Sequence, residues 1–461
     1  MLSGPDGPTA RWLTSVAGLA AVTAVTRRLD EGATTLAVAE QLRGAVADPA
    51  RRAAVVDAAL ARRRARARWP DAESLLFTGE ALEQASDPAV SAHRAARLVV
   101  ALTADGGRGG GGAGRLVDLG CGVGGDTLAL ARAAPPGVEV HAVDRDPGRL
   151  ALLAHNAEVA GVEVTIRCAD LRELTLSPHD VLHADPGRRE GGRRLRHLSE
   201  YQPPVDALLA AHGHAAAGAV ALAPGVDIDD AALPEDVEVE YVQLGDALVE
   251  ATLWWGAAAA DGPAVRRTRA SLLPAPTGPG PSTSPILTSH LGVPSEREWL
   301  PVAEVGALLI DPAAAVVRAR LHDDLGRSIG AWRTARHRAV LSADRTPPTS
   351  PWLRARRVLA VLPGRPRAVR AWLRSAEAAA AWRELAGQHD AAAATTTPTV
   401  EVVLHGVDAD PVAVWRELGR PPRGPRGIRV ELLRRDTDTI TVVTVADQVS
   451  HPTATMGVWM T

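Results

Sequence analysis

A run of glycines directly after an apolar segment constrains the fold of this chain more than any other feature. Residues 115–119 have the apolar pattern of a buried β-strand, and four glycines follow among residues 120–125. Glycine has no Cβ, so such a run allows a ligand to lie against the backbone at a turn from strand to helix. Asp126 can cap the helix that follows, and residues 127–134 direct apolar side chains toward a sheet. The pattern predicts an α/β sheet with a ligand site above this strand.

Acidic residues stand where such a site can use them. Asp144 ends a second predicted strand at residues 138–143, where a carboxylate can accept hydrogen bonds from both ribose hydroxyls of an adenosine. Asp118 lies two positions before the first glycine and can approach an ammonium group. Asp170 ends a third predicted strand, where it can accept the amino group of adenine. Together these positions predict a site for an adenosine that also has an ammonium group.

The glycine pattern by itself leaves two cofactors open. Three of the glycines also satisfy the dinucleotide-binding fingerprint, which occurs often by chance. Asp118 and Asp170 favour S-adenosylmethionine instead. So does Asp185, which follows a fourth strand at residues 181–184 and lies at the edge where such sheets place their chemistry. The predicted chemistry is therefore methyl transfer, and a dinucleotide is the alternative cofactor.

The alternation of predicted elements divides the chain into four parts. We expect an N-terminal helical region at residues 1–105, an α/β domain at 115–256, a linker and connecting segment at 257–350, and a small α/β domain at 351–450. In the second part, seven strands are expected at residues 115–119, 138–143, 164–169, 181–184, 219–223, 237–244 and 247–255. A tight-turn signal, Gly245-Asp246, joins the last two as a hairpin. The fold class is α/β, with a Rossmann-like seven-strand sheet of the class I methyltransferase kind.

Charge and cysteine content restrict the function classes. The net charge is −3, so binding of nucleic acid would need a local basic patch. The two cysteines, Cys121 and Cys168, support neither a disulfide framework nor a zinc site, and we expect no metal. The apolar segment at residues 13–25 is too short to span a bilayer and resembles an amphipathic helix. We therefore expect a cytoplasmic protein that does not enter a membrane, while its oligomeric state stays open.

Several stretches of the chain resemble known methyltransferases. Residues 122–127 and 154–162 resemble segments of trimethylguanosine synthase and its bacterial relatives. Over roughly residues 60 to 450, the chain is more similar to a bacterial group of class I methyltransferases with a THUMP-like C-terminal domain. In that group the fourth strand typically ends in Asp-Pro-Ala-Arg-Arg, where this chain has Asp-Pro-Gly-Arg-Arg at residues 185–189. The resemblance implies S-adenosylmethionine as the cofactor and RNA as a partner.

Two further segments extend this resemblance. An upstream Glu-Gln-Ala-Ser element matches at residues 83–86, and the C-terminal match is closest at residues 406–411. Where the group usually has a basic pair before that glycine, this chain has Leu404-His405. With the motifs above, the expected donor-binding residues are Asp118, Gly120, Gly122, Gly124, Asp126, Thr127, Asp144, Asn156 and Asp170.

The expected catalytic residues are Asp185, Pro186 and Arg188. Enzymes that methylate amines place Asp or Asn, then prolines and an aromatic residue, at this strand end. The carboxylate and the proline carbonyl hold the amine while the aromatic ring stacks on the base. Here Arg188 takes the aromatic position, and its guanidinium plane can stack on a base while nearby arginines bind phosphates. An equally good interpretation is a solvated loop.

The basic clusters at residues 62–68, 188–196 and 365–374 are the candidate contacts to RNA. For the first of these, a solvated helix face is the favoured interpretation. The sequence thus predicts a methyltransferase that acts on RNA, with an amine on a base as the acceptor. A methyltransferase of small molecules and a cofactor-binding protein without productive transfer remain as alternatives.

Overall fold

The structure of the protein is a computed structural model. In it the chain forms two compact units, residues 1–294 and 295–461. It describes residues 5–105, 114–187, 189–190, 193–194, 197–227, 229, 233–259, 267–274, 288–292, 299–364, 366–387, 399–408, 410, 413–414, 418, 427–435 and 438–445. Arg188 lies outside these residues. So do most of residues 106–114, which the glycine-rich sequence predicts to be a flexible connector, and most of residues 410–418, which the sequence pattern predicts to be a helix.

Helices open the first unit, as the apolar period of this region predicts. They are α1 (Gly7–Leu13), α2 (Val16–Asp30), α3 (Thr35–Ala45), α4 (Pro49–Ala65), α5 (Gly79–Gln84) and α6 (Pro88–Asp105). The first five begin at a side chain that accepts a hydrogen bond from the first turn, namely Asp6, Ser15, Thr34, Asp48 and Thr78. None of the helices in the described part of the chain combines the length and the hydropathy that a membrane span requires.

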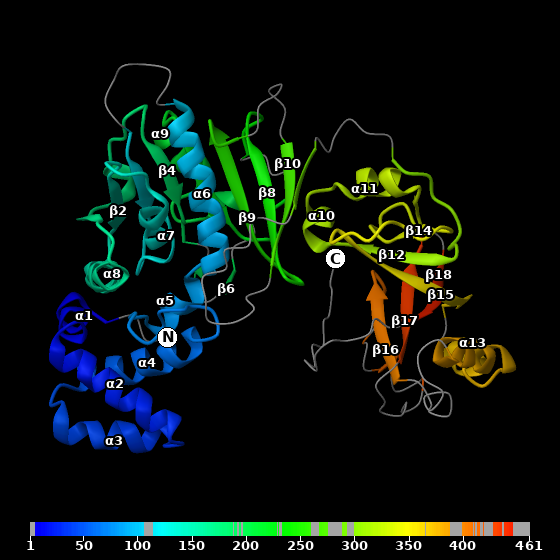
Figure 1. The fold of residues 1–461 in the computed structure, drawn as a ribbon, viewed down its shortest axis with the longest axis horizontal. Helices are drawn as coiled ribbons and strands as arrows, with labels where there is room; N and C mark the ends of the chain where they lie inside the picture. The colour runs from blue at the N-terminus through cyan, green and yellow to red at the C-terminus, as the bar shows by residue number, and fades with distance from the viewer. Residues whose placement is uncertain are drawn as a thin grey trace. The chain divides into compact units, whose positions relative to one another are not determined.

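A nine-stranded sheet forms the centre of the first unit (Figure 1). Its strands, in spatial order, are β11 (Thr288–Gly292), β10 (Arg267–Leu273), β8 (Glu238–Leu244), β9 (Ala247–Gly256), β7 (Ala217–Leu222), β4 (Val181–Ala184), β1 (Leu116–Leu119), β2 (Val140–Asp144) and β3 (Thr165–Cys168). The run from β3 to β7 is parallel, and β9 is antiparallel to both of its neighbours. The carboxyl ends of β1, β2 and β4 therefore meet at one edge.

Helices α6, α7 (Gly125–Ala133) and α8 (Pro147–Ala160) pack beside this sheet. Leu98 of α6 and Leu130 of α7 share an apolar cluster with Leu116 and Val181 of the neighbouring parallel strands. Helices α1 to α5 form a further cluster that reaches Leu128 and other residues of α7 and α8. The N-terminal helices thereby support the turn between β1 and α7.

The nine strands exceed the seven that the sequence predicts, because β10 and β11 lie in the segment expected to be a linker. Pro and Gly are frequent around these two strands, so the composition of the segment does not predict them. In β10, Arg269 and Ser271 bind the buried carboxylates of Glu238 and Glu240 on β8. Polar residues that look solvated in the sequence are thus paired inside the sheet.

The second unit contains a seven-stranded sheet. Its strands, in spatial order, are β13 (Trp332–Arg333), β14 (Leu341–Ala343), β12 (Leu308–Pro312), β15 (Leu353–Pro363), β18 (Thr439–Val445), β17 (Gly427–Arg434) and β16 (Thr399–His405). Its helices are α10 (Ala314–Arg318), α11 (His322–Ile329), α12 (Pro366–Trp372) and α13 (Ala376–Gly387). Three of the strands lie within residues 257–350, the expected linker and connecting segment. The structured part of this unit begins well before residue 351.

Candidate active site

The turn after β1 brings two glycines into conformations that other residues rarely adopt. Gly120 has a φ of 76°, and a Cβ there would lie 2.9 Å from the carbonyl oxygen of Asp185. Gly124 has a φ of 101° and is the N-cap of α7, and its Cβ would lie 2.4 Å from Leu153. Both positions therefore require glycine. Asp126 was expected to cap α7, but the helix begins at Gly125, two residues earlier than that role requires.

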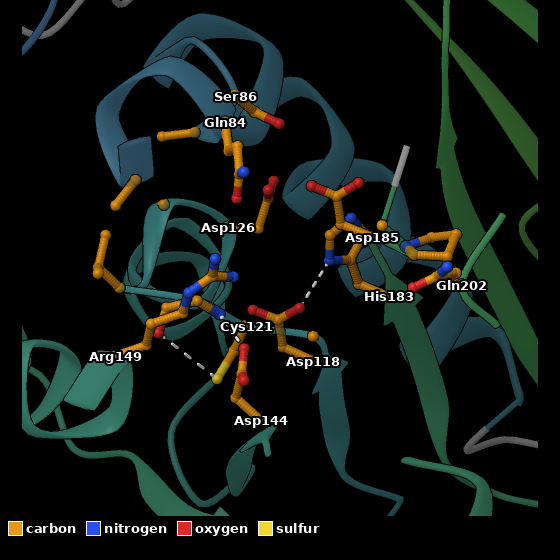
Figure 2. A pocket seen from close by; sticks show the side chains of 18 of the residues that line it. Gln84, Ser86, Asp118, Cys121, Asp126, Asp144, Arg149, His183, Asp185 and Gln202 are labelled. Atoms are coloured by element: carbon orange, nitrogen blue, oxygen red, sulfur yellow. Dashed lines mark hydrogen bonds and ion pairs between the residues drawn. The ribbon is translucent and has the colours of Figure 1, made fainter. Parts of the chain in front are cut away.

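A cavity of about 1050 Å³ lies above the carboxyl ends of β1, β2 and β4 (Figure 2). Six of the nine expected donor-binding residues line it: Asp118, Gly120, Gly122, Asp126, Asp144 and Asp170. Asp185 and Pro186 line it as well. The structure thus brings residues that are up to 68 positions apart in the sequence to one site.

Asp144 ends β2 and holds the glycine turn in place. Its carboxylate accepts hydrogen bonds from the backbone amides of Gly122 and Asp146, each 2.9 Å long. The side chain is oriented by these two bonds, and Figure 2 shows it directed into the cavity. An oriented carboxylate of this kind is suited to bind a pair of hydroxyls.

Asp118 is buried under the site, and both of its carboxylate oxygens have partners within the protein. Thr127 donates from its hydroxyl to Oδ2, while Nδ1 of His183 lies 2.8 Å from Oδ1 (Figure 2). The side chain of Thr127 is fully buried, and Thr127 does not line the cavity. Its expected role in donor binding is therefore corrected to a structural one, because its hydroxyl faces Asp118.

Asp126 belongs to a buried ion network that reaches across the sheet. Arg94 of α6 donates to Oδ1 of Asp126 at 2.6 Å, to Glu250 of β9, and to the hydroxyl of Ser86 at 3.0 Å. Arg94 itself is 2% exposed. Although burial disfavours the charged carboxylate, Arg94 and His183 hold the pKa of Asp126 below its usual range.

Asn156 was expected to contact the donor, and the structure corrects this. It is completely buried in α8, and it does not line the cavity. Its side-chain amide accepts from the Leu76 amide at 2.8 Å and donates to the carbonyls of Leu76 and Val123 at 3.0 Å. These hydrogen bonds join the N-terminal helical region to the glycine turn. Gly124, which also does not line the cavity, supports the same turn.

Asp170 follows β3 at the rim of the cavity. It caps the short helix η1 (Leu171–Glu173) by accepting from the Arg172 amide at 2.9 Å. Hydrogen bonds from the Arg172 side chain and backbone hold the pKa of Asp170 below its usual range. The carboxylate is therefore ionised at neutral pH and can accept a hydrogen bond from a ligand.

The acceptor end of the cavity is built on the residues after β4. The amide of Asp185 donates to the carbonyl of Leu119 at 3.1 Å, which fixes this segment against β1. Gly187 pairs with Gln202 in an isolated β-bridge, and both residues line the cavity. Between them lies a short hairpin of β5 (Arg189–Glu190) and β6 (Arg193–Arg194). The hairpin therefore extends from the rim of the cavity.

Arg94, His183 and Glu250 line or support the site although the sequence alone did not single them out. A signal was present for two of them: His183 is a polar residue in an apolar strand, and Arg94 is a charge within the apolar period of a helix. Their partners, however, are up to 156 positions away in the chain. Such pairs are set by the fold and not by local spacing.

The basic cluster at residues 62–68 is largely paired within the first unit. Arg63 and Arg66 bind Asp30, and Arg66 also binds Glu73. Arg62 is buried, with 3% of its surface exposed. The interpretation of this cluster as a structural helix face is therefore the better one.

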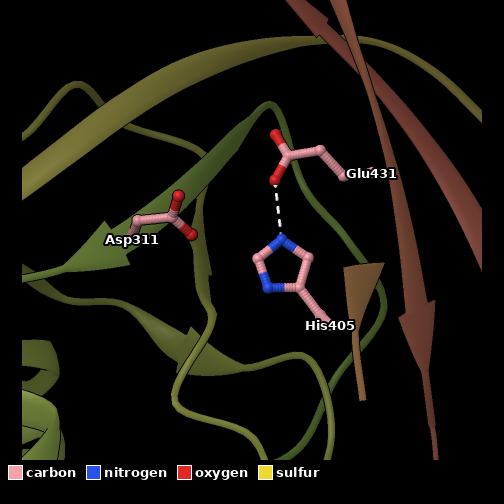
Figure 3. A group of neighbouring side chains, drawn as sticks. All are labelled: Asp311, His405 and Glu431. Carbon is pink, nitrogen blue, oxygen red and sulfur yellow. Dashed lines mark hydrogen bonds and ion pairs between the residues drawn. The ribbon is translucent and has the colours of Figure 1, made fainter. Parts of the chain in front are cut away.

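In the second unit, Asp311, His405 and Glu431 lie together in the manner of metal ligands (Figure 3). Two arginines already neutralise this group. Arg356 binds both Asp311 and Glu431, and Arg429 lies 3.8 Å from Asp311. Nε2 of His405 lies 2.9 Å from Glu431. Although burial opposes ionisation, His405 and Arg356 lower the pKa of Glu431 to about 2. The group is thus a paired charge cluster within a sheet.

The residues of the first cavity fit S-adenosylmethionine. This donor has a cationic sulfonium and an ammonium, and the cavity is lined by the carboxylates of Asp118, Asp126, Asp144, Asp170 and Asp185. At Gly122, an added Cβ would meet nothing within 4 Å, so the backbone is open to a ligand. Asp144 would hold the ribose, and the glycine turn would lie against the rest of the donor.

Comparisons with known proteins agree with this fit. A family model described as a methyltransferase domain matches residues 116–184. Uncharacterized S-adenosylmethionine-dependent methyltransferases from two strains of Mycobacterium tuberculosis are each 32% identical over 371 residues, which cover 80% of this chain and 87% of the relative. A crystal structure from Porphyromonas gingivalis W83, provisionally described as a methyltransferase, has a TM-score of 0.63 at 16% identity and covers 87% of this chain and 92% of its own. The chain therefore belongs to the family of class I S-adenosylmethionine-dependent methyltransferases.

Proposed function

We propose that this methyltransferase acts on an amino group, and that Asp185 holds the acceptor. Methyl transfer from a sulfonium is an in-line displacement, in which the donor supplies an already activated methyl group. The enzyme must therefore mainly orient the nucleophile. The carboxylate of Asp185 accepts a hydrogen bond from the amine and the carbonyl of Pro186 accepts a second, which directs the nitrogen lone pair toward the donor. The position of Asp185 in the cavity, on a backbone fixed to β1, supports this role.

We further propose that the amine belongs to a base of RNA. The single observation that favours this substrate is the hairpin of β5 and β6, which lies in the chain between the cavity-lining residues Gly187 and Gln202. Arg189, Arg193 and Arg194 belong to this hairpin and Arg188 precedes it in the sequence; the four are here called the hairpin arginines. Guanidinium groups bind phosphates and stack on bases. A flipped or single-stranded base can thus enter the cavity while its phosphates remain at the hairpin.

We also propose that residues 351–450 form a THUMP-like domain that contacts RNA, in a chain related to trimethylguanosine synthase. In the second unit, Arg367 and Arg370 lie one turn apart on α12, Arg374 follows, and all three are exposed. They form a basic face to which phosphates can bind. His405 stands where the related group has part of a basic pair, but it is bound to Glu431. The α12 face is therefore the better candidate in this unit.

The proposal is tested by following labelled methyl groups from the donor. Purified protein is incubated with methyl-labelled S-adenosylmethionine and with fractionated total RNA, total protein or small metabolites. We expect label in an RNA fraction, on an amino nitrogen after digestion to nucleosides. Asp185→Ala should lower the rate of this transfer by about a hundredfold, the usual scale for a positioned polar group, and should bind the donor as before.

Two outcomes would overturn the RNA proposal. Label only in metabolites would make the protein a small-molecule methyltransferase. Donor binding without label in any fraction would make it a cofactor-binding protein without productive transfer. An equal rate for wild type and Asp185→Ala would remove the role of the carboxylate while leaving the substrate class intact.

A further inference from the structure

His183 is a buried histidine at the floor of the cavity, between the donor side and the acceptor side. It belongs to β4 and is paired in register with Asp118 of β1. Figure 2 shows its imidazole between the carboxylates of Asp118 and Asp185. The residue lines the cavity although only 1% of its surface is exposed. It thus stands at the place where the acceptor loses a proton.

The two ring nitrogens of His183 have different surroundings. Nδ1 lies 2.8 Å from Oδ1 of Asp118, a contact in which the ring donates because an ionised carboxylate can only accept. Nε2 is buried and has no hydrogen-bond partner among the described residues. A buried polar atom without a partner is unfavourable for the folded state, and a function can explain why it is kept. The arrangement resembles a carboxylate–histidine pair in which the second nitrogen receives a proton.

We propose that His183 is the general base of the methyl transfer, with Asp118 as its positioning residue. The acceptor nitrogen forms a bond to the methyl carbon with its lone pair, and the carbon–sulfur bond breaks with its electrons returning to sulfur. The proton of the acceptor N–H moves to Nε2 of His183, and Asp118 stabilises the resulting imidazolium. Asp185 orients the nitrogen during this step. This inference depends on the methyltransferase activity and not on RNA as the substrate.

The charges around His183 decide when it can act as a base. Burial disfavours its protonation, and Arg94 of α6 acts in the same direction. Asp126 of α7 and Asp118 of β1 outweigh both and raise the pKa of His183 above its usual value. Before a donor binds, the imidazole therefore keeps its proton to a higher pH than an ordinary histidine does. A cationic sulfonium in the same cavity favours loss of this proton, so donor binding prepares the base.

Calorimetry can test this without a known acceptor. S-adenosylmethionine and S-adenosylhomocysteine are titrated into the full-length protein near pH 7 in two buffers of different ionisation enthalpy. We expect the cationic donor to release a fraction of a proton per site and the neutral-sulfur product to release less. His183→Asn should abolish that difference, because the asparagine amide can still donate to Asp118 but offers no nitrogen at Nε2. It should bind S-adenosylhomocysteine as wild type does.

A matched control is His212→Asn in α9 (Val205–His212), since His212 is equally buried and does not line the cavity. This control should release protons like wild type. Equal release by wild type and His183→Asn, or none by wild type, would overturn the proposal. His183→Gln serves as a second variant if His183→Asn does not fold. Once an acceptor fraction is labelled, His183→Asn should also lose the rise of the transfer rate with pH, by about a hundredfold at its maximum.

Discussion

At the scale of single residues, the carboxylates of the cavity differ in what already binds them. Asp118 has both oxygens occupied by Thr127 and His183, so its main task in the protein is to orient those side chains. The carboxylate of Asp144 accepts hydrogen bonds from two backbone amides, and its side chain also lines the cavity. The donor should therefore depend most directly on Asp144.

Replacing Asp144 by alanine should weaken donor binding by about 2 kcal/mol or more. The change removes charge-assisted hydrogen bonds to the ligand and loosens the Gly122 turn. Titration calorimetry with S-adenosylmethionine measures the loss. Asp146→Ser is the control. A serine at position 146 keeps an oxygen that can cap α8, and the carboxylate of Asp144 stays in place. Unchanged affinity of Asp144→Ala would show that the ribose lies elsewhere.

The sequence could predict the residues whose roles follow from strand ends. Asp144, Asp170 and Asp185 each follow a strand, and the parallel topology brings them to one edge. Asn156 shows the limit of that reasoning. Its place on α8 was correctly expected, yet the N-terminal helices cover it and use its amide. Local spacing does not reveal which side of a helix a distant segment will bury.

At the scale of elements, α6 connects the glycine turn to the far part of the sheet. Arg94 binds Asp126 on α7 and Glu250 on β9, and Ser86 joins the same network. The Glu-Gln-Ala-Ser element at residues 83–86 therefore precedes the helix that holds the site together. Buried networks of this kind keep a fixed geometry only when every member is paired.

The variant Arg94→Met should destabilise the protein by about 3–5 kcal/mol, because it leaves buried carboxylates without their partner.

The free energy of unfolding of the wild-type protein should also fall in acid. The pKa of Asp126 is lowered in the folded state, so its contribution is complete above the usual carboxyl pKa and is lost as pH falls toward the lowered value. Denaturant unfolding from about pH 6 down to about pH 2, a range that extends below the usual carboxyl pKa, checks both. In Arg94→Met, the free energy of unfolding should depend less on pH in acid than it does in the wild type. A control substitution of the exposed Arg132 should leave this pH dependence unchanged.

The proposed binding of RNA depends on the hairpin of β5 and β6. Replacing the four hairpin arginines by glutamine should make binding less salt-dependent, with the log-log slope reduced by up to about 3 for four phosphate contacts to a single strand. Donor affinity should not change. Filter binding at several salt concentrations measures the slope. The control replaces four exposed arginines elsewhere in the first unit: Arg11, Arg27, Arg43 and Arg167. An equal loss in that control would indicate only a general effect of charge.

At the scale of the whole molecule, the chain is two units, and all residues that line the donor cavity belong to the first. Calorimetric unfolding of the full-length protein should therefore show two transitions. Donor at about 100 times its dissociation constant should stabilise one of them by about 2.7 kcal/mol. Arg94→Met should lower the same transition. A donor that shifts both transitions equally would contradict a site within one unit.

The sequence predicted the first unit better than the second, for a physical reason. Buried parallel strands such as β1 and β4 are short apolar runs between turn signals, and their bounds agree within a few residues. Strands β10 and β15 contain arginines that bind buried carboxylates within their sheets, namely Arg269 with Glu238 and Arg356 with Glu431. A charge paired inside a sheet looks the same in a sequence as a charge in water. The extent of both sheets could therefore not be read from hydropathy.

Donor and acceptor should meet in the cavity above β1, β2 and β4. A crystal structure of the protein with S-adenosylhomocysteine shows whether they can. We expect the ribose hydroxyls within hydrogen-bonding distance of Asp144, the glycine turn against the ligand, and the sulfur of the ligand on the side of His183 and Asp185. A ligand bound outside this cavity, or bound in it with the ribose away from Asp144, would contradict this arrangement.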